Sequence, residues 1–173
     1  MHISWLGQTC IKLQTKNQDK DVIILIDAYK PKKGEFPRNF SPDIALFSQG
    51  QDNSATISPD TFVVDSLGEM EVKNVMIYSL PGFEGNVIYK LNAEGLNMVH
   101  LGRLKKPISN GELEKIMSPD ILFIPVGGGE SYMDARTAAE LANTLEARII
   151  IPIAYNCDTD PDVAPITAFI KEL

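Results

Sequence analysis

Two segments that end predicted strands carry polar side chains suited to a binding pocket. Residues 48–54 (SQGQDNS) follow a buried strand and offer amides, hydroxyls and a carboxylate, although a solvated turn is the simpler interpretation. Residues 99–103 (VHLGR) end a second strand with His100 and Arg103. The chain has only 2 histidines, and a zinc site usually takes several His, Cys or carboxylate ligands. The sequence is therefore poor in zinc ligands.

Three further segments have both a chemical and a structural interpretation. The glycines of residues 125–129 (PVGGG) could let the backbone approach a phosphate. No Lys-Ser/Thr pair follows, so this is not a nucleotide P-loop, and a tight strand-to-helix connection is the simpler interpretation. Cys157 could be a nucleophile or a buried inert thiol. Glu69 and Glu71 share one strand face and could be an acid/base pair or a solvent-facing edge.

The elements that must position these residues are strands first, followed by alternating strands and helices. Strands are expected at residues 3–6, 11–14, 22–26, 44–47, 61–64, 75–80, 87–91, 98–101, 121–124 and 148–152, and helices at 110–117, 134–145 and 165–173. Residues 16–21 are predicted to be a polar turn, and residues 31–42, with three prolines, a loop. This order predicts two sheets covered by helices in one domain, residues 1–173.

Composition excludes several classes of protein. The chain has 173 residues, is 44% hydrophobic and carries a formal net charge of -7, which argues against nucleic-acid or anionic-membrane partners because these need a basic surface. Its 2 cysteines exclude a disulfide scaffold. No apolar run approaches the roughly 20 residues of a membrane span. A cytoplasmic protein is the expectation.

The collinear order of these segments resembles the metallo-β-lactamase superfamily, and in particular its short, UlaG-like branch of metal-dependent hydrolases. The segments that carry the resemblance are residues 3–10 (ISWLGQTC), 22–27, 42–48, 68–72 (GEMEV), 86–89, 100–102, 124–129 and 151–153. The resemblance implies a four-layer αββα sandwich of two mixed β-sheets. It also implies that one or two zinc-type ions activate water to hydrolyse an ester, lactam, lactone or phosphodiester.

The family's metal-ligand positions hold other residues in this chain. Without gaps, the family's H-x-H-x-D-H loop falls on residues 49–54. Its ligands then become Gln49, Gln51, Asn53 and Ser54, or a one-residue gap keeps Asp52 as the motif's Asp with Asn53 in the last His place.

Later landmarks of the family also depart from its pattern. Arg103 replaces the bridging Asp of the H-L-G-D segment, Ala154 the final His, and Gln8 the His of the opening turn. His100 and the buried Asp27 keep the family's residue types.

These replacements predict that the zinc-type site is lost, and no other cofactor is expected. Neutral amide oxygens bind such ions more weakly than imidazole or carboxylate. The Arg103 cation, about 4 Å from a dication, would be repelled by several kcal/mol even at an effective dielectric near 20. Its guanidinium is instead expected to occupy the vacated centre and to pair with Asp27 or Asp52.

The resulting prediction is a non-catalytic hydrolase homologue, a pseudoenzyme with a binding or assembly role. The expected residues of its vestigial pocket are Gln8, Asp27, Gln49, Gln51, Asp52, Asn53, Ser54, His100, Arg103 and Ala154. This pocket could take a small polar or anionic ligand, or be a filled polar cluster. The alternatives are a working hydrolase with unconventional ligands among Asp27, Asp52, His100 and Asp158, or an interaction protein. The latter would bind a partner or a second copy, with the basic loop 30–38 as its exposed surface.

Overall fold

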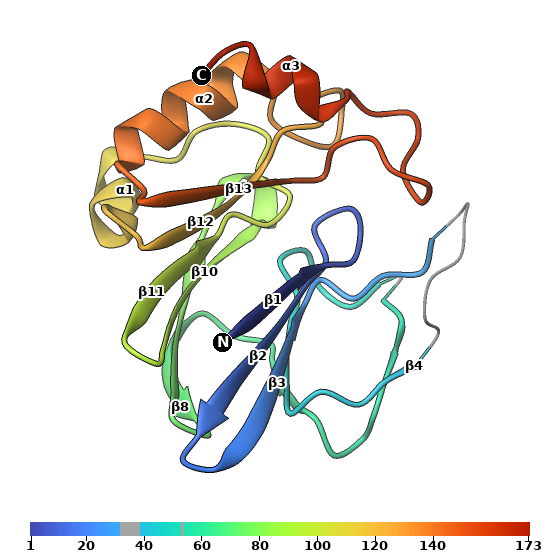
Figure 1. Ribbon diagram of the computed structural model, residues 1–173, viewed down its shortest axis with the longest axis vertical. Coiled ribbons are helices and arrows are strands. Elements are labelled where there is room, and N and C mark those ends of the chain that lie inside the picture. The colour runs from blue at the N-terminus through green and yellow to red at the C-terminus, as the bar shows by residue number, and fades with distance from the viewer. Residues whose placement is uncertain (32–38, 53) are drawn as a thin grey trace.

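Two mixed β-sheets pack face to face in this computed structural model, which describes residues 1–31, 39–52 and 54–173 (Figure 1). The first sheet has the order β1-β2-β3-β5-β7, formed by His2–Trp5, Ile11–Asn17, Lys20–Ile26, Ile44–Leu46 and Phe62–Val64. The second has the order β13-β12-β11-β10-β9-β8, formed by Ile149–Ile153, Ile121–Pro125, Leu96–His100, Val87–Ala93, Val75–Pro81 and Gly68–Val72. The predicted sandwich of two mixed sheets is confirmed.

The strand sequences match their places in the sheets. β3 pairs with antiparallel β2 on one side and parallel β5 on the other, so its apolar run is covered by neighbours and packing on both faces. All five residues of β12 are buried between parallel β11 and β13. By contrast, β2 and β9 alternate buried and partly buried residues, as strands with one core face do.

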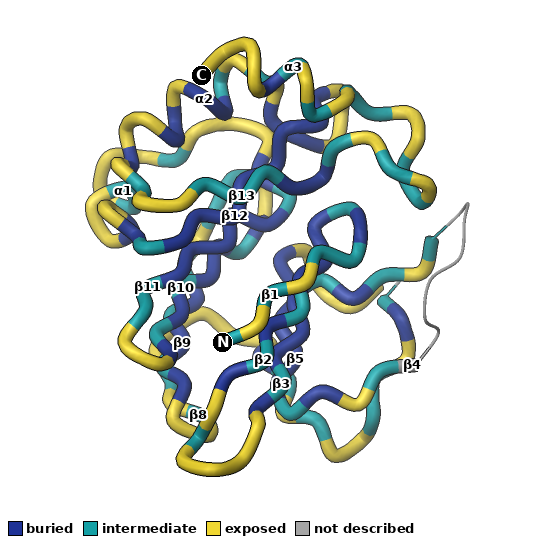
Figure 2. The backbone as a smooth tube through the Cα atoms, viewed as in Figure 1, coloured by how far each residue is buried: buried dark blue, intermediate teal, exposed yellow. Residues whose placement is uncertain are grey.

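Most of the apolar core lies between the two sheets. Ile11, Leu13 and Ile24 of the first sheet share one cluster with Ile77 and Phe123 of the second. A second cluster joins the outer face of the second sheet to the helices, for example Val99 and Leu122 to Leu141. Figure 2 shows this distribution, with buried backbone along the strands and exposed backbone on the outer turns.

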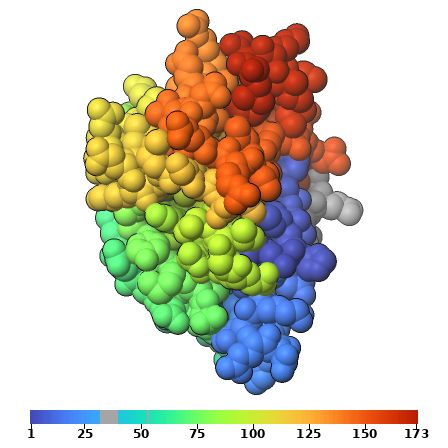
Figure 3. Space-filling model, turned by 60° about the vertical axis from the view of Figure 1, so that its left-hand side comes forward, coloured from blue at the N-terminus to red at the C-terminus, as the bar shows by residue number. Residues whose placement is uncertain are grey.

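All helices of the described residues follow β11 in the chain, apart from the one-turn 3₁₀ segment η1 (Phe83–Gly85). They are α1 (Asn110–Ile116), α2 (Ala135–Leu145) and α3 (Ile166–Ile170). α2 begins where Asp134 accepts a hydrogen bond from the Thr137 N–H at 3.0 Å. In Figure 3 the C-terminal helices, orange and red, cap one end of the molecule.

The outer face of the first sheet is covered differently from the four-layer expectation. A small cluster that includes Leu25, Ala45 and Phe47 is covered by Phe40 and Ile57. These belong to the short parallel pair β4 (Asn39–Phe40) and β6 (Thr56–Ile57), which the sequence did not predict. The layer over this face is therefore built from loops and a two-stranded ladder within the described part of the chain.

Other expectations differ from the structure in their bounds. The predicted turn 16–21 is mostly strand, because β2 and β3 continue as a hairpin to the Asn17–Lys20 pair. Of the predicted loop 31–42, residues 32–38 lie outside the described residues. The last helix is shorter than residues 165–173. No helix among the described residues is long and apolar enough to cross a membrane.

β13 is an outer strand of the second sheet. Ile149 and Ile153 form their backbone hydrogen bonds with the side of the sheet that holds β12. In a parallel ladder alternate residues direct their backbone groups to opposite sides, so Ile151 also faces β12. The backbone groups of Ile150 and Pro152 therefore point away from the sheet, and Pro152 has no N–H to donate.

Candidate functional site

Three of the predicted site residues, Gln8, Asp27 and His100, lie where strands of both sheets end at one edge of the sandwich. Gln8 follows β1, Asp27 follows β3, and His100 ends β11. The backbone joins the sheets here, since the Ala154 N–H donates to the Gln8 carbonyl at 2.8 Å and the Val87 N–H donates to the Ser48 carbonyl at 2.7 Å. The sandwich therefore brings distant strand ends into one polar cluster.

Asp27 and Ser48 form a closed pair within this cluster. One Asp27 carboxylate oxygen accepts from the Ser48 N–H at 2.6 Å, and the other accepts from the Ser48 hydroxyl at 2.7 Å. Asp27 itself has a left-handed backbone (φ 55°), a conformation rare outside glycine. Both carboxylate oxygens are thus engaged in shaping the turn after β5.

His100 is also fully engaged. Its side chain is buried, its Nε2 contacts the Thr9 carbonyl at 2.9 Å, and its Nδ1 accepts from the Gly102 N–H at 3.1 Å. A proton on Nε2 satisfies both contacts. Burial lowers the pKa of His100 below its ordinary value, although the nearby Asp27 carboxylate opposes this shift. His100 is therefore a neutral structural link between the sheets.

Arg103 lies at the centre of a hydrogen-bonded chain across the mouth of the sandwich. Its Nη2 donates to Gln8 Oε1 at 2.8 Å and to the Tyr132 hydroxyl at 3.3 Å, and the guanidinium lies 5.5 Å from the Tyr132 ring centroid. The Tyr132 hydroxyl donates in turn to Asp160 Oδ2 at 3.0 Å. Burial raises the pKa of Tyr132 to about 12, against the lowering effect of the Arg103 charge, so Tyr132 stays a neutral donor.

The expected pairing of Arg103 with Asp27 or Asp52 is wrong in this structure. Among the described residues Arg103 forms no ion pair with either carboxylate, because Asp27 is occupied by Ser48 and Asp52 is exposed. The side-chain oxygen of Gln8 accepts the hydrogen bond from the guanidinium instead. Arg103 also lines the cavity described next.

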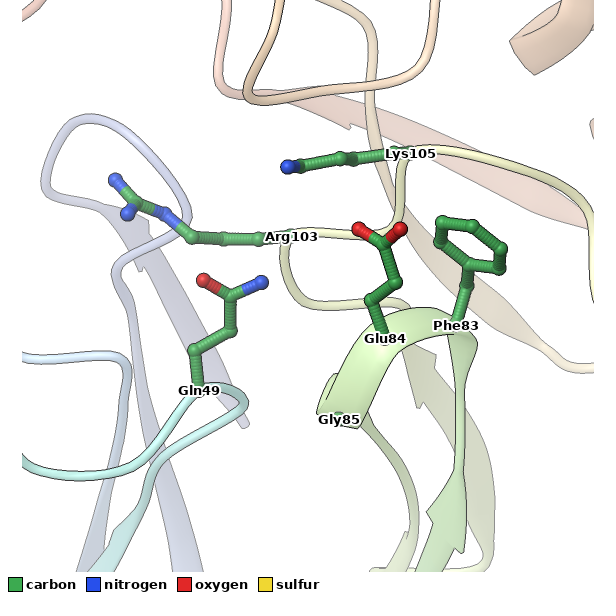
Figure 4. A pocket seen from close by; sticks show the side chains of 6 residues that line it. All are labelled: Gln49, Phe83, Glu84, Gly85, Arg103 and Lys105. Carbon is green, nitrogen blue, oxygen red and sulfur yellow. The ribbon is translucent and has the colours of Figure 1, made fainter.

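A polar cavity of about 340 Å³ opens beside this chain (Figure 4). Its lining residues are Gln49, Phe83, Glu84, Gly85, Arg103 and Lys105. Figure 4 shows the Gln49 amide below the Arg103 side chain and the Lys105 ammonium above it. The cavity therefore presents two cationic side chains, one carboxylate and one amide.

The backbone turn before Arg103 depends on Gly102. This residue has φ +62°, and a Cβ on it would lie 2.4 Å from Ser48 Cβ and 2.7 Å from Asn86 Oδ1. The buried Asn86 side chain accepts from the Arg103 N–H at 2.8 Å and donates to the Leu101 carbonyl at 2.9 Å. Asn86 and Gly102 together fix where the Arg103 side chain starts.

Several predicted pocket residues lie apart from the cavity lining. Gln51, Asp52 and Asp158 are exposed, and Ser54 is partly buried with its N–H bonded to the Gln51 carbonyl. Asn53 lies outside the described residues. Ala154 is buried with φ 56° and contributes its backbone N–H rather than its side chain. Among the described residues of the predicted loop 49–54, Gln49 is therefore the one that lines the cavity.

The residues present do not fit a zinc-type ion. Within residues 1–31, 39–52 and 54–173, no group of three or more His, Cys, Asp or Glu side chains is placed to hold a metal. Both polar atoms of His100 and both carboxylate oxygens of Asp27 already have protein partners. The Arg103 guanidinium also lies at this mouth, and its charge repels cations.

The other candidate segments have structural roles. Gly127 lies so close to β13 that a Cβ on it would be 2.0 Å from the Ala154 carbonyl, as a tight strand-to-helix connection requires. Burial and the Asp27 charge raise the pKa of Cys10, and Cys157 Sγ contacts Thr159 Oγ1 at 3.4 Å. Glu69 and Glu71 are exposed on the edge strand β8.

Sequence reasoning missed Tyr132, Asp160, Glu84 and Lys105. Tyr132 and Asp160 lie in two C-terminal loops that only the tertiary structure brings together. Lys105 could have been found, because it follows Arg103 by two positions after a strand end.

The chain is similar in sequence to known proteins over nearly its whole length. A family model described as the beta-lactamase superfamily domain matches residues 2–154. A UPF0173 metal-dependent hydrolase from Methanoregula boonei is 21% identical over 191 aligned positions, which cover 90% of this chain and 82% of the relative.

Solved structures show the same architecture. A candidate Zn-dependent hydrolase of the metallo-β-lactamase superfamily from Thermotoga maritima has 26% identity and a TM-score of 0.82, covering 99% of this chain and 85% of that protein. The metallo hydrolase Igni18 from Ignicoccus hospitalis has 14% identity and a TM-score of 0.72, covering 98% and 88% of the two chains. The similarity to Igni18, at 14% identity, concerns the fold alone.

Proposed function

This chain belongs to the metallo-β-lactamase superfamily, and from that premise we propose that it is a non-catalytic member that binds a small anionic ligand. The ligand would lie in the cavity lined by Gln49, Arg103 and Lys105. The proposal departs from the metal-dependent hydrolysis named for the relatives, and it is supported by the hydrogen bonds of Arg103 to Gln8 and Tyr132.

The observation that carries the proposal is the placement of the Arg103 guanidinium. It stands at the sequence position of the family's bridging Asp and is held there by Gln8 and Tyr132. A fixed cation at that point would repel a dication, and the amides of Gln8 and Gln49 are weak ligands for one. The same cation attracts an anion.

The charges of the cavity favour an anion in spite of the acidic chain. The whole protein has a formal charge of -7, whereas the cavity holds Arg103 and Lys105 against the single carboxylate of Glu84. The cavity is thus a local cationic region on an acidic surface, and such regions concentrate anionic ligands. Arg103 and Lys105 both offer charge-assisted hydrogen bonds to a carboxylate or phosphate.

Metal analysis and anion titration test the two parts of this proposal. Protein purified from medium supplemented with zinc, iron and manganese should hold far less than one ion per chain. Inorganic phosphate should shift the amide NMR signals of residues around Arg103 and Lys105 saturably. Lys105→Met should weaken this binding about 10-fold, the effect of losing one charged hydrogen bond, and Lys20→Met, an exposed lysine elsewhere, should leave it unchanged.

Two results would overturn the proposal. One is a tightly bound transition ion at one per chain together with hydrolysis of an ester, lactone or phosphodiester, which would support a hydrolase with unconventional ligands. The other is a phosphate response that is equal in Lys105→Met and in the unchanged protein. A chain carrying Q49H, Q51H, S54H, R103D and A154H provides the positive control, since it should gain zinc.

A further inference from the structure

We propose that the ligand of the cavity is zwitterionic and is a free α-amino acid. Its carboxylate would lie against Arg103 and Lys105, and its ammonium would lie against Glu84. This inference rests on the proposed function, because it concerns the same cavity, but it adds a requirement for a positive group on the ligand.

The first argument is that charges of opposite sign line the cavity without pairing. Among the described residues, the side chains of Glu84 and Lys105 form no ion pair or hydrogen bond, and Glu84 forms none with Arg103. In Figure 4 the Lys105 side chain extends from the upper segment and the Glu84 side chain from the lower one, and both line the cavity. A simple anion would satisfy the cations but be repelled by Glu84, whereas a zwitterion satisfies both signs.

The second argument concerns Arg103. Both hydrogen bonds of its guanidinium, to Gln8 and Tyr132, use Nη2. Within the described chain Nε and Nη1 have no protein acceptor, so their N–H groups are available to a ligand. These contacts hold the guanidinium in one orientation before the ligand arrives, which lowers the entropy cost of binding.

The third argument is the backbone that presents Glu84. Glu84 has φ 50° and ψ 46°, and the next residue, Gly85, has φ +79°. A left-handed conformation is unfavourable for a residue with a side chain, and such residues concentrate at ligand-binding sites. Figure 4 shows the Glu84 side chain extending from this turn beside the cavity.

The size and polarity of the cavity restrict the choice of ligand further. A volume of about 340 Å³ is at the small end of ligand pockets. Apart from Phe83 and Gly85, its lining side chains are polar or charged. A small amino acid with a polar side chain, such as glutamine, fits this surface better than an apolar one.

Ligand series that differ by one charged group test the proposal. The intact chain is titrated with L-glutamine, with glutaramate, which lacks the ammonium, and with 4-aminobutyramide, which lacks the carboxylate, and binding is followed by amide NMR. Each of the other common amino acids is titrated in the same way. The amino acid that binds most tightly should bind at least about 10-fold more tightly than its analogue without the ammonium.

Paired variants then assign the contacts. Glu84→Gln should weaken amino-acid binding about 10-fold while leaving glutaramate binding equal or tighter. Glu71→Gln, the same change at an exposed site on β8, should alter neither. Lys105→Met should weaken both ligands.

The outcomes separate this inference from the proposed function. If glutaramate and phosphate bind in a Lys105-dependent way but no amino acid binds more tightly than its analogue, the cavity takes plain anions and the zwitterion proposal is wrong. If no anion binds in a Lys105-dependent way, the proposed function fails as well. If the Glu84→Gln and Glu71→Gln proteins bind the best amino acid equally, Glu84 does not hold the ammonium.

Discussion

Replacing Gly102 by alanine should destabilise the protein by about 2–4 kcal/mol. Alanine at φ +62° costs about 1–2 kcal/mol in backbone strain. Its Cβ would lie 2.4 Å from Ser48 Cβ and 2.7 Å from Asn86 Oδ1, and overpacking of this kind costs about 1–3 kcal/mol. The reduced freedom of the unfolded chain offsets about 0.4–1 kcal/mol of this. Neither neighbour can move freely, because Ser48 is bonded to Asp27 and Asn86 to Arg103.

Gly129 supplies the matched control. It has a similar φ of +68°, but nothing lies within 4 Å of the place a Cβ would occupy. Gly129→Ala should therefore cost only the backbone strain, about 1 kcal/mol. Urea unfolding measures both variants, and the midpoint should fall further for Gly102→Ala without a change in the slope. Equal midpoints would refute the close packing of Ser48, Gly102 and Asn86.

Three further predictions concern the site and its supports. Arg103→Met should lose about 1–2 kcal/mol of stability in urea unfolding, because its hydrogen bonds to Gln8 and Tyr132 are lost. Arg136→Met, at an exposed position on α2, should leave stability nearly unchanged, and equal losses in the two variants would contradict the network. Burial holds the pKa of His100 below its ordinary 6.5, so the unfolded chain takes up a proton at a higher pH than the folded chain does. The free energy of unfolding should therefore keep its full value above pH 6.5 and fall below that pH by at most about 1.4 kcal/mol per pH unit. His2→Gln, an exposed histidine, should keep this slope, and constant stability between pH 6.5 and 5 would show that His100 titrates normally. Asp134→Ala should cost about 1 kcal/mol by removing the cap of α2, measured by thermal unfolding, and an unchanged midpoint would contradict that role.

The sequence predicted the strands well because their signals are local. The β-branched run of β3 and the apolar run of β12 mark strands buried between neighbours, and both are confirmed. The predicted strands of the β2–β3 hairpin were too short, because the polar residues at its end resemble a turn. In the structure, backbone pairing with the opposite strand holds these residues extended. The β4–β6 pair was missed because two-residue strands have no periodicity to detect.

The site was predicted less completely, because its contacts are formed by loops from distant parts of the chain. Two of the residues predicted from segments at strand ends, Arg103 and Gln49, line one cavity. Spacing within one segment could not show that Gln8 receives the guanidinium, since 95 positions separate the two residues. Asp27 was expected as an ion-pair partner, but its turn geometry directs both oxygens to Ser48. Such preferences depend on backbone direction at strand ends, which no local pattern encodes.

The outward-facing proline of β13 has a consequence for self-association. An outer strand can template a strand from another molecule when its free donors and acceptors alternate without interruption. Pro152 removes the donor from one of the two outward-facing positions between Ile149 and Ile153. A visiting strand would have to leave an acceptor unsatisfied there, which opposes growth of the sheet in spite of the strongly β-forming isoleucines.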